Sequence, residues 1–213
     1  FHINQAINFH RKNRPLATLL LAPQNPPFRF TPLRMDNDGN IINFLDATNA
    51  VDPTSETYVF TGIHIIEPDI FKYIEHGVFQ EIISQGYKRA LKDGRRVLGY
   101  RVGGYWNDLG SPSGYLQAVQ DVLSGRLGDS PSDSFIAGNS RIHPQALTRN
   151  CSLESGCILG AGSKVINSIV WENSVIAEDG EVVDCIIGSG VKVTGMHKHE
   201  VITLNGHLSI GGH

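Results

Sequence analysis

Residues 150–166 read NCSLESGCILGAGSKVI, and residues 167–183 read NSIVWENSVIAEDGEVV. Both segments begin with asparagine and a small residue, and aliphatic residues then return at intervals of six, six and five positions. The pattern starts at residues 133, 150, 167 and 184, which is a period of 17. Such self-similarity is the signature of a solenoid, whose coils bury a continuous core only when they are stacked.

The four repeats align column by column. The polar column holds Asp133, Asn150, Asn167 and Asp184, the small column holds Ser134, Cys151, Ser168 and Cys185, and the turn column holds Asn139, Gly156, Asn173 and Gly190. The apolar columns hold Ile136, Leu153, Val170 and Ile187, then Ile142, Leu159, Ile176 and Val193, then Thr148, Val165 and Val182. Asparagine and glycine share a column because both adopt positive φ at a corner. We therefore expect three short strands per coil, with one inward side chain each.

A degraded fifth coil follows if the period of 17 continues, and it would place Leu204 and Ile210 inward. It lacks the polar columns, as a capping repeat would. In the regular coils, Cys151 and Cys185 share a column with serines, which predicts small packed side chains rather than catalytic or metal-binding ones.

The first half alternates predicted strands and helices, which indicates an α/β layer. Helices are predicted over 3–13, 68–75, 81–91 and from Pro112 with Ser111 as N-cap, and strands over 17–22, 41–44, 57–66 and 97–102. The turn at 36–39 joins a hairpin. Glycines and a proline in 124–133 indicate a linker. We expect domains at 1–124 and 133–213, joined by residues 125–132.

Three segments carry a resemblance to a known family. Trp106 to Pro112 reads WNDLGSP, which resembles the W-x-D-x-G-[TS]-P motif of sugar-phosphate nucleotidyltransferases. Residues 58–64, YVFTGIH, are similar to that family's F-x-G-[IL]-[HY] strand, and the helix followed by 17–21, ATLLL, is similar to an earlier segment. A C-terminal β-helix is frequent in the same family, as in mannose-1-phosphate guanylyltransferases. The resemblance therefore spans essentially the whole chain.

The resemblance implies the fold and the chemistry. The fold would be the back half of a Rossmann-like α/β nucleotidyltransferase domain, followed by a left-handed parallel β-helix of hexapeptide repeats. The reaction joins an NTP to a sugar 1-phosphate, makes an NDP-sugar and releases pyrophosphate. Asp108 would ligate Mg²⁺, Gly62 and Thr61 would lie at the sugar phosphate, and Asp46 would contact sugar hydroxyls.

The family's catalytic head does not occur in these residues. It is a glycine-rich G-G-x-G-[ST]-R-L loop whose amides cradle nucleotide phosphates. We expect that the chain begins within the catalytic domain and is inactive alone. The family's Glu-Lys-Pro is also replaced near Asp46, so the sugar and the nucleotide base stay open.

Other readings compete with these assignments. Asp108 also fits an ordinary turn acid, Gly62 a strand glycine beside a close-packed helix, and His64 either core packing or a ligand contact. His197 and His199 fall where the repeat breaks, which favours a solvated loop over a metal site. The chain also fits a catalytically silent regulatory or scaffolding homologue that uses the β-helix for assembly.

A hexapeptide-repeat acyltransferase is disfavoured, because the regular coils contain only His143 as a candidate base and that family has no place for the α/β segment.

Composition narrows the function classes further. The net charge is −3 and the pI about 6.3, so no basic surplus supports nucleic-acid binding. No apolar run is long enough to span a bilayer. Three cysteines, an odd number without metal-type spacing, favour a reduced, cytoplasmic setting. We expect a homo-oligomer assembled through the β-helix.

Overall fold

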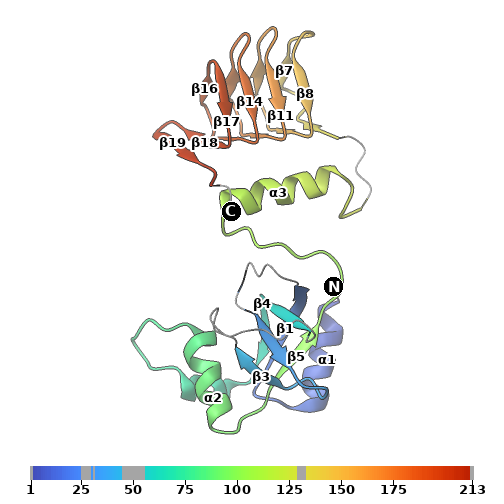
Figure 1. Cartoon of the computed structure of the whole chain (residues 1–213), viewed down its shortest axis with the longest axis vertical. Helices are drawn as coiled ribbons and strands as arrows, with labels where there is room; N and C mark the ends of the chain where they lie inside the picture. The colour runs from blue at the N-terminus through green and yellow to red at the C-terminus, as the bar shows by residue number, and fades with distance from the viewer. Residues whose placement is uncertain (1, 25–29, 31, 45–55, 129–132, 212–213) are drawn as a thin grey trace. The chain divides into compact units, whose positions relative to one another are not determined.

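The computed structural model describes residues 2–24, 30, 32–44, 56–128 and 133–211 (Figure 1). These residues form two compact units, Phe1–Trp106 and Asn107–His213. No helix among the described residues has the length and apolar character needed to cross a membrane.

The first unit is built on a five-stranded mixed sheet with the order β3-β2-β4-β1-β5. Its strands are β1 (Ala17–Gln24), β2 (Leu33–Met35), β3 (Ile41–Phe44), β4 (Thr57–Ile66) and β5 (Val97–Arg101). β1 pairs in parallel with β5 and antiparallel with β4. The predicted hairpin at 36–39 joins β2 to β3, so the α/β expectation is confirmed.

Helices cover both faces of this sheet. On one face, Leu20 and Ala22 of β1 pack with Ala6 of α1 (Ile3–Asn13). On the other face, Leu19 and Leu21 pack with residues from the two helical segments that follow β4. Those segments are a 3₁₀ helix η1 (Pro68–Tyr73) and a π-helical turn η2 (Ile82–Tyr87) that continues into α2 (Lys88–Lys92). Because neighbouring side chains of a strand point to opposite faces, β1 is apolar on both faces from Leu19 to Ala22.

The second unit is a parallel β-solenoid over residues 135–202, joined to helix α3 (Pro112–Leu123). Its three sheets have the orders β16-β13-β10-β7, β17-β14-β11-β8 and β19-β18-β15-β12-β9-β6. The strands are β6 (Phe135–Ile136), β7 (Arg141–Ile142), β8 (Leu147–Arg149), β9 (Ser152–Leu153), β10 (Ile158–Leu159), β11 (Lys164–Ile166), β12 (Ile169–Val170), β13 (Val175–Ile176), β14 (Glu181–Val183), β15 (Ile186–Ile187), β16 (Lys192–Val193), β17 (Met196–Lys198), β18 (Glu200–Thr203) and β19 (Gly206–Ser209). The register pairs Val165 with Val182 and Ile169 with Ile186, which confirms the 17-residue repeat.

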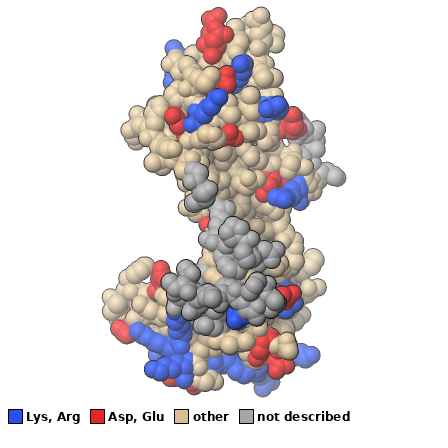
Figure 2. All heavy atoms as spheres, in the orientation of Figure 1, with Lys and Arg blue, Asp and Glu red and all other residues tan. Residues whose placement is uncertain are grey.

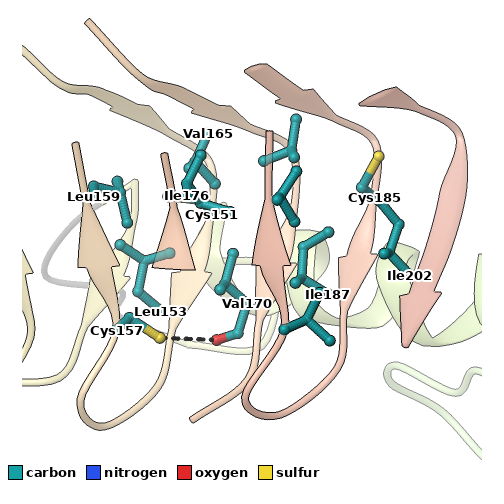
Figure 3. Packing of buried hydrophobic residues seen from close by; sticks show 13 residues of the cluster. Cys151, Leu153, Cys157, Leu159, Val165, Val170, Ile176, Cys185, Ile187 and Ile202 are labelled. Carbon is teal, nitrogen blue, oxygen red and sulfur yellow. Dashed lines mark hydrogen bonds between the residues drawn. The ribbon is translucent and has the colours of Figure 1, made fainter. Parts of the chain in front are cut away.

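The apolar columns point into the solenoid (Figure 3). Leu153, Val170 and Ile187 are fully buried in one column, and the three cysteines are buried beside them. Cys157 Sγ donates to the carbonyl oxygen of Trp171 at 3.2 Å, and burial raises the pKa of its thiol. Cys151 and Cys185 are free and packed, as the column that they share with serines predicts, and Cys157 is free and buried as well.

Positive φ marks the corners of the coils. Asn150 and Asn167 have φ 48° and Asp184 has φ 54°, and each side chain reaches its neighbour one coil on. Asn150 donates to Asn167 at 3.0 Å, and Asn167 donates to Asp184 at 3.1 Å. In the turn column, a Cβ on Gly156 would lie 2.5 Å from Oδ1 of Asn173. Glycine there leaves room for the asparagine side chain of the next coil.

The last coil differs from the expected one. Ile187 pairs with Ile202 and Val182 pairs with His197, so the final coil is shorter than 17 residues. The prediction for Leu204 is therefore wrong: Ile202 is buried, whereas Leu204 is 76% exposed in the turn of a hairpin. The reason is a shorter corner at Gly195, which has φ 76°.

The segment around His197 is likewise not a loop. His197 lies in β17 at the inward column, and His199 takes the positive-φ corner that Asp184 takes one coil earlier. The sequence favoured a solvated loop because the shortened coil hides the repeat from a search at a fixed period of 17.

Helix α3 packs on an outer face of the solenoid. Ile169 and Ile186 precede the inward Val170 and Ile187, and they pack outward against Leu116 of α3. Gln120 of α3 also donates to the carbonyl oxygen of Asn167 at 3.1 Å. By these contacts α3 belongs with the solenoid.

The shortened coil makes a stability prediction. Ile202→Ala empties part of the buried column and should lower the free energy of unfolding by about 2–5 kcal/mol. Leu204→Ala, at the exposed hairpin turn, should change it by less than about 0.5 kcal/mol. Urea unfolding of the two variants measures both effects, and a larger loss in Leu204→Ala would contradict the shortened register.

Candidate functional site

Strand β4 carries a bulge at Thr61 and Gly62. The β1–β4 register pairs Leu19 with His64 and Leu21 with Phe60, so three residues of β4 face the single residue Leu20. Gly62 has φ 85°, a backbone conformation that costs an ordinary residue about 1–2 kcal/mol. No atom of a described residue lies within 4 Å of a Cβ built on Gly62. The glycine therefore serves the backbone conformation and leaves open space, and it does not make room for a close-packed helix.

The peptide between Thr61 and Gly62 is held from two sides. The Thr61 hydroxyl donates to the carbonyl oxygen of Leu20 at 2.9 Å. The indole Nε1 of Trp106 donates to the carbonyl oxygen of Thr61 at 3.2 Å. Trp106 is itself fixed by an edge contact with Phe30, with ring centroids 5.4 Å apart. Because the Thr61 carbonyl is directed at the indole, the Gly62 N–H points the opposite way.

From the sequence, Trp106 is expected to pack under the turn that carries Asp108, and its hydrogen bond to Thr61 was not predicted. The link to Thr61 joins segments that are far apart in the chain. The tryptophan of the W-x-D-x-G-[TS]-P motif is the sequence signal that could have found it.

His64 belongs to the core of the first unit. Its Nδ1 is 2.7 Å from the hydroxyl of buried Tyr87, and its ring lies 5.7 Å from that of Phe60. Burial raises the pKa of Tyr87, so the phenol keeps its proton and its O–H donates a hydrogen bond to Nδ1 of His64. Burial lowers the pKa of His64. Between the two readings of His64, the contacts support core packing.

Asp108 lies at the start of the second unit, in a turn tied to α3. Asn107 donates to the carbonyl oxygen of Gly114 at 3.2 Å, and the Ser111 side chain accepts from the Gly114 N–H at 3.1 Å. The Asp108 carboxylate folds over Gly110, where a Cβ would lie 2.9 Å from Oδ2. This explains why the motif has glycine two residues after the acid.

The Asp108 side chain is half-buried, and no hydrogen bond or ion pair engages it among the described residues. The side chain of Ser111 caps α3, so Asp108 is not the helix cap that an ordinary turn acid would supply. A carboxylate that is partly desolvated and accepts no donor fits the hard-oxygen ligand that Mg²⁺ prefers. Asp46, which was predicted to contact sugar hydroxyls, lies outside the described residues.

Two cavities in the first unit lie away from Gly62. One of about 630 Å³ is bordered by α1 and η1 and includes His10, Glu67 and Arg95. His10 is buried there, 3.1 Å from Glu67 and 2.8 Å from Thr18. The other, of about 240 Å³, is lined by Phe44, Phe60 and residues of η2. Neither contains Thr61 or Gly62.

Basic side chains of the first unit occur beside acidic ones (Figure 2). The ion pairs are Lys72–Asp69, Arg89–Glu75, Arg95–Asp69 and Arg101–Glu56. They are solvent-exposed pairs, each worth little to stability. Their mixed signs agree with the low net charge of the chain.

His64 is half-buried, and the desolvation that lowers its pKa makes stability depend on pH. An unfolded histidine has a pKa of about 6.5 and takes up a proton before folded His64 does. The unfolded state then binds more protons, so the free energy of unfolding falls as the pH drops below about 6.5. We expect His64→Asn to show a smaller fall between about pH 7.5 and 5.5 than the unaltered chain.

Urea unfolding at the two pH values measures this effect. His76→Asn is the control, because His76 is exposed, and it should keep the full fall. An identical fall in His64→Asn and in the unaltered chain would show that other groups carry the pH dependence.

The amino-acid sequence of the chain is similar to those of several known proteins. The chain is 26% identical to a mannose-1-phosphate guanylyltransferase of Mycobacterium tuberculosis, over 86% of the chain and 51% of that protein. It is 26% identical to a glucose-1-phosphate adenylyltransferase of Acetivibrio thermocellus, over 89% of the chain and 51% of that protein. It is 23% identical to a glucose-1-phosphate thymidylyltransferase of Streptomyces griseus, over 98% of the chain and 61% of that protein.

The chain thus spans about half the length of the first two of these relatives and somewhat more of the third. The family match itself covers residues 1–125, which include the Gly62 bulge, Trp106, Asp108 and all of α3. The chain belongs to the nucleotidyl transferase family.

Proposed function

We propose that these residues are part of a sugar-1-phosphate nucleotidyltransferase, which makes an NDP-sugar and pyrophosphate from an NTP and a sugar 1-phosphate. The relatives' names support the reaction class, because all three pair a sugar 1-phosphate with a nucleotidyl group. The names differ in nucleotide and in sugar, so they leave both identities open.

The observation that carries the proposal is the Gly62 bulge. A phosphate can approach a backbone closely only where no side chain intervenes, and the space above Gly62 is open among the described residues. The Gly62 N–H points away from Trp106, because the Thr61 carbonyl of the same peptide points toward Trp106. It is therefore oriented to donate to a phosphate on that side. We assign the sugar phosphate to this peptide. Thr61 acts through its backbone, since its hydroxyl proton is committed to Leu20.

Asp108 is the proposed ligand for Mg²⁺. Mg²⁺ is commonly held by one or two carboxylates together with substrate phosphates, and a single unengaged carboxylate suits this mode. When bound, Mg²⁺ neutralises charge on the phosphates during in-line displacement. The chain's own contribution is to hold the carboxylate in place through Asn107, Gly110 and the start of α3. Asp46 stays a proposal as the contact for sugar hydroxyls.

The 213 residues contain no glycine-rich G-G-x-G-[ST]-R-L loop. Loop amides and its arginine supply the donors that stabilise phosphoryl transfer. We therefore infer that these residues alone do not catalyse the reaction, and that activity belongs to a longer polypeptide that includes such a loop. A silent scaffolding role is the second candidate, and the missing loop is the observation that favours it.

We place the protein in the cytoplasm, since its three cysteines are free and buried in the solenoid core. We also propose that it forms a homo-oligomer through the solenoid. In the first coil, Phe135 is 56% and Leu147 49% exposed, and inward-column Ile136 is 39% exposed. Exposed apolar residues on edge strands are suited to pairing with a second chain.

The oligomer proposal predicts a dimer or larger assembly by light scattering at micromolar concentration. Leu147→Asp should shift the mass toward the monomer, because a charge would be buried in the interface. A monomeric mass of 23.3 kDa for the unaltered chain would contradict the proposal.

The proposed role of Asp108 predicts a loss of activity in a polypeptide that carries the glycine-rich loop. Asp108→Asn should lower pyrophosphate release by about a hundredfold or more, because the amide cannot replace a charged metal ligand. The assay uses NTPs and sugar 1-phosphates with Mg²⁺.

Asp93→Asn is the matched control, since Asp93 is an exposed turn acid and should leave activity unchanged. Circular dichroism checks that both variants are folded. Unchanged activity in Asp108→Asn would remove this residue from the mechanism, and no activity in the unaltered longer polypeptide would favour the scaffolding role.

A further inference from the structure

Three strands bring His197, Glu200 and His207 together at the C-terminal end of the solenoid. His197 lies in β17, Glu200 begins β18 and His207 lies in β19. His207 pairs with inward-facing Ile202, and Glu200 is two residues before Ile202 on the same face of β18. Because paired and alternate residues share a face, both side chains turn toward the end of the core, where His197 continues the inward column.

The three side chains converge on one oxygen. His197 Nδ1 lies 2.9 Å from Glu200 Oε2, and His207 Nδ1 lies 3.3 Å from the same oxygen. The three ligand atoms all lie within 4.8 Å of one another. In a tetrahedral zinc site with bonds of about 2.0–2.1 Å, two ligand atoms are separated by about 3.3 Å. The two nitrogen–oxygen separations, 2.9 and 3.3 Å, are close to this value.

The contacts of His197 point to a ligand at Nδ1. Its Nε2 is 3.1 Å from the carbonyl oxygen of Thr194, which can only accept a hydrogen bond. Its Nδ1 faces the Glu200 carboxylate, which is also an acceptor. A neutral imidazole has one N–H and satisfies only one of these partners. With Nε2–H donating to a backbone carbonyl, the lone pair of Nδ1 is directed at the cluster, which is the arrangement of a metal-bound histidine.

We propose that His197, Glu200 and His207 form a zinc-class metal site that fastens the β18–β19 hairpin to the last coil. Two imidazoles and one carboxylate suit zinc rather than Mg²⁺ or Ca²⁺, which prefer oxygen. Three protein ligands leave the fourth position to water, and His207, 52% exposed, leaves a path for the ion. The site lies on the solenoid and is independent of the proposed transfer reaction.

The hairpin gives the site a structural purpose. The last coil is short, and β19 is an edge strand whose four residues are all exposed. It is joined to the solenoid through the antiparallel pairing with β18. A shared ion would tie β19 directly to β17, which precedes the hairpin, and so close the end of the core.

Titration of the chelator-treated chain with Zn²⁺ tests the proposal. We expect one ion per chain by isothermal calorimetry, and a melting temperature about 5 °C higher at a zinc concentration a hundredfold above Kd. Co²⁺ should give visible absorption bands typical of tetrahedral coordination. His207→Gln and Glu200→Gln should each weaken binding at least tenfold.

His199→Asn is the matched control. His199 is next to the site in sequence but outside the cluster, and asparagine tolerates its positive φ. It should bind Zn²⁺ as the unaltered chain does. Circular dichroism confirms folding, and two ligand variants guard against one that fails to fold. Absence of binding, or His207→Gln binding as tightly as the unaltered chain, would overturn the site and leave an ion-pair cluster.

Discussion

The inward stacking of aliphatic side chains at a 17-residue spacing is the constraint on which the second unit depends. No single coil has enough apolar surface to stay folded, so each depends on the one above and below. Leu153, Val170, Ile187 and Ile202 form one continuous column across the coils. Many of the corners that return the chain to that column adopt positive φ, which asparagine, aspartate and glycine tolerate well.

The solenoid also supports Asp108, the candidate Mg²⁺ ligand, because α3 packs against it. The outer face of one solenoid sheet is apolar at Ile169 and Ile186, and α3 packs there. The first turn of α3 in turn holds Asn107 and caps itself with Ser111, so the turn that carries Asp108 is supported by the solenoid. The family match includes α3, but in the structure α3 makes its contacts with the solenoid and belongs to the second unit. We therefore infer that the solenoid has a role besides assembly, which is to hold the turn that carries Asp108.

Local patterns predicted a large part of this structure. The 17-residue period, the hairpin turn at 36–39, the α1 helix and the Ser111 cap are all written in short stretches, and each is found in the structure. The outward residues of the doubled aliphatic pairs, such as Ile169 beside Val170, were not predicted to be buried, because nothing local says that α3 covers them. The final coil was misplaced because its corner is shorter, which no fixed period can reveal.

The candidate site was less predictable, because its contacts join distant residues. The motifs singled out Gly62 and Asp108, but the bulge at Gly62 depends on the register of β1 against β4. The indole of Trp106 meets Thr61 across 45 positions of sequence. The His197–Glu200–His207 cluster depends on the shortened coil and on the hairpin, and neither was visible in the repeat.

Amide hydrogen exchange across the second unit tests most directly whether α3 and the solenoid form one cooperative structure. The amides of Glu154, Trp171 and Gly188 donate to carbonyls of the following coil at 2.9, 2.9 and 2.8 Å, and should be strongly protected. We expect α3 amides such as that of Tyr115, which donates to the carbonyl oxygen of Ser111 at 2.9 Å, to share that protection and to lose it together with the ladder in denaturant. Rapid exchange throughout α3 beside a protected ladder would contradict the claim that the solenoid supports the Asp108 turn.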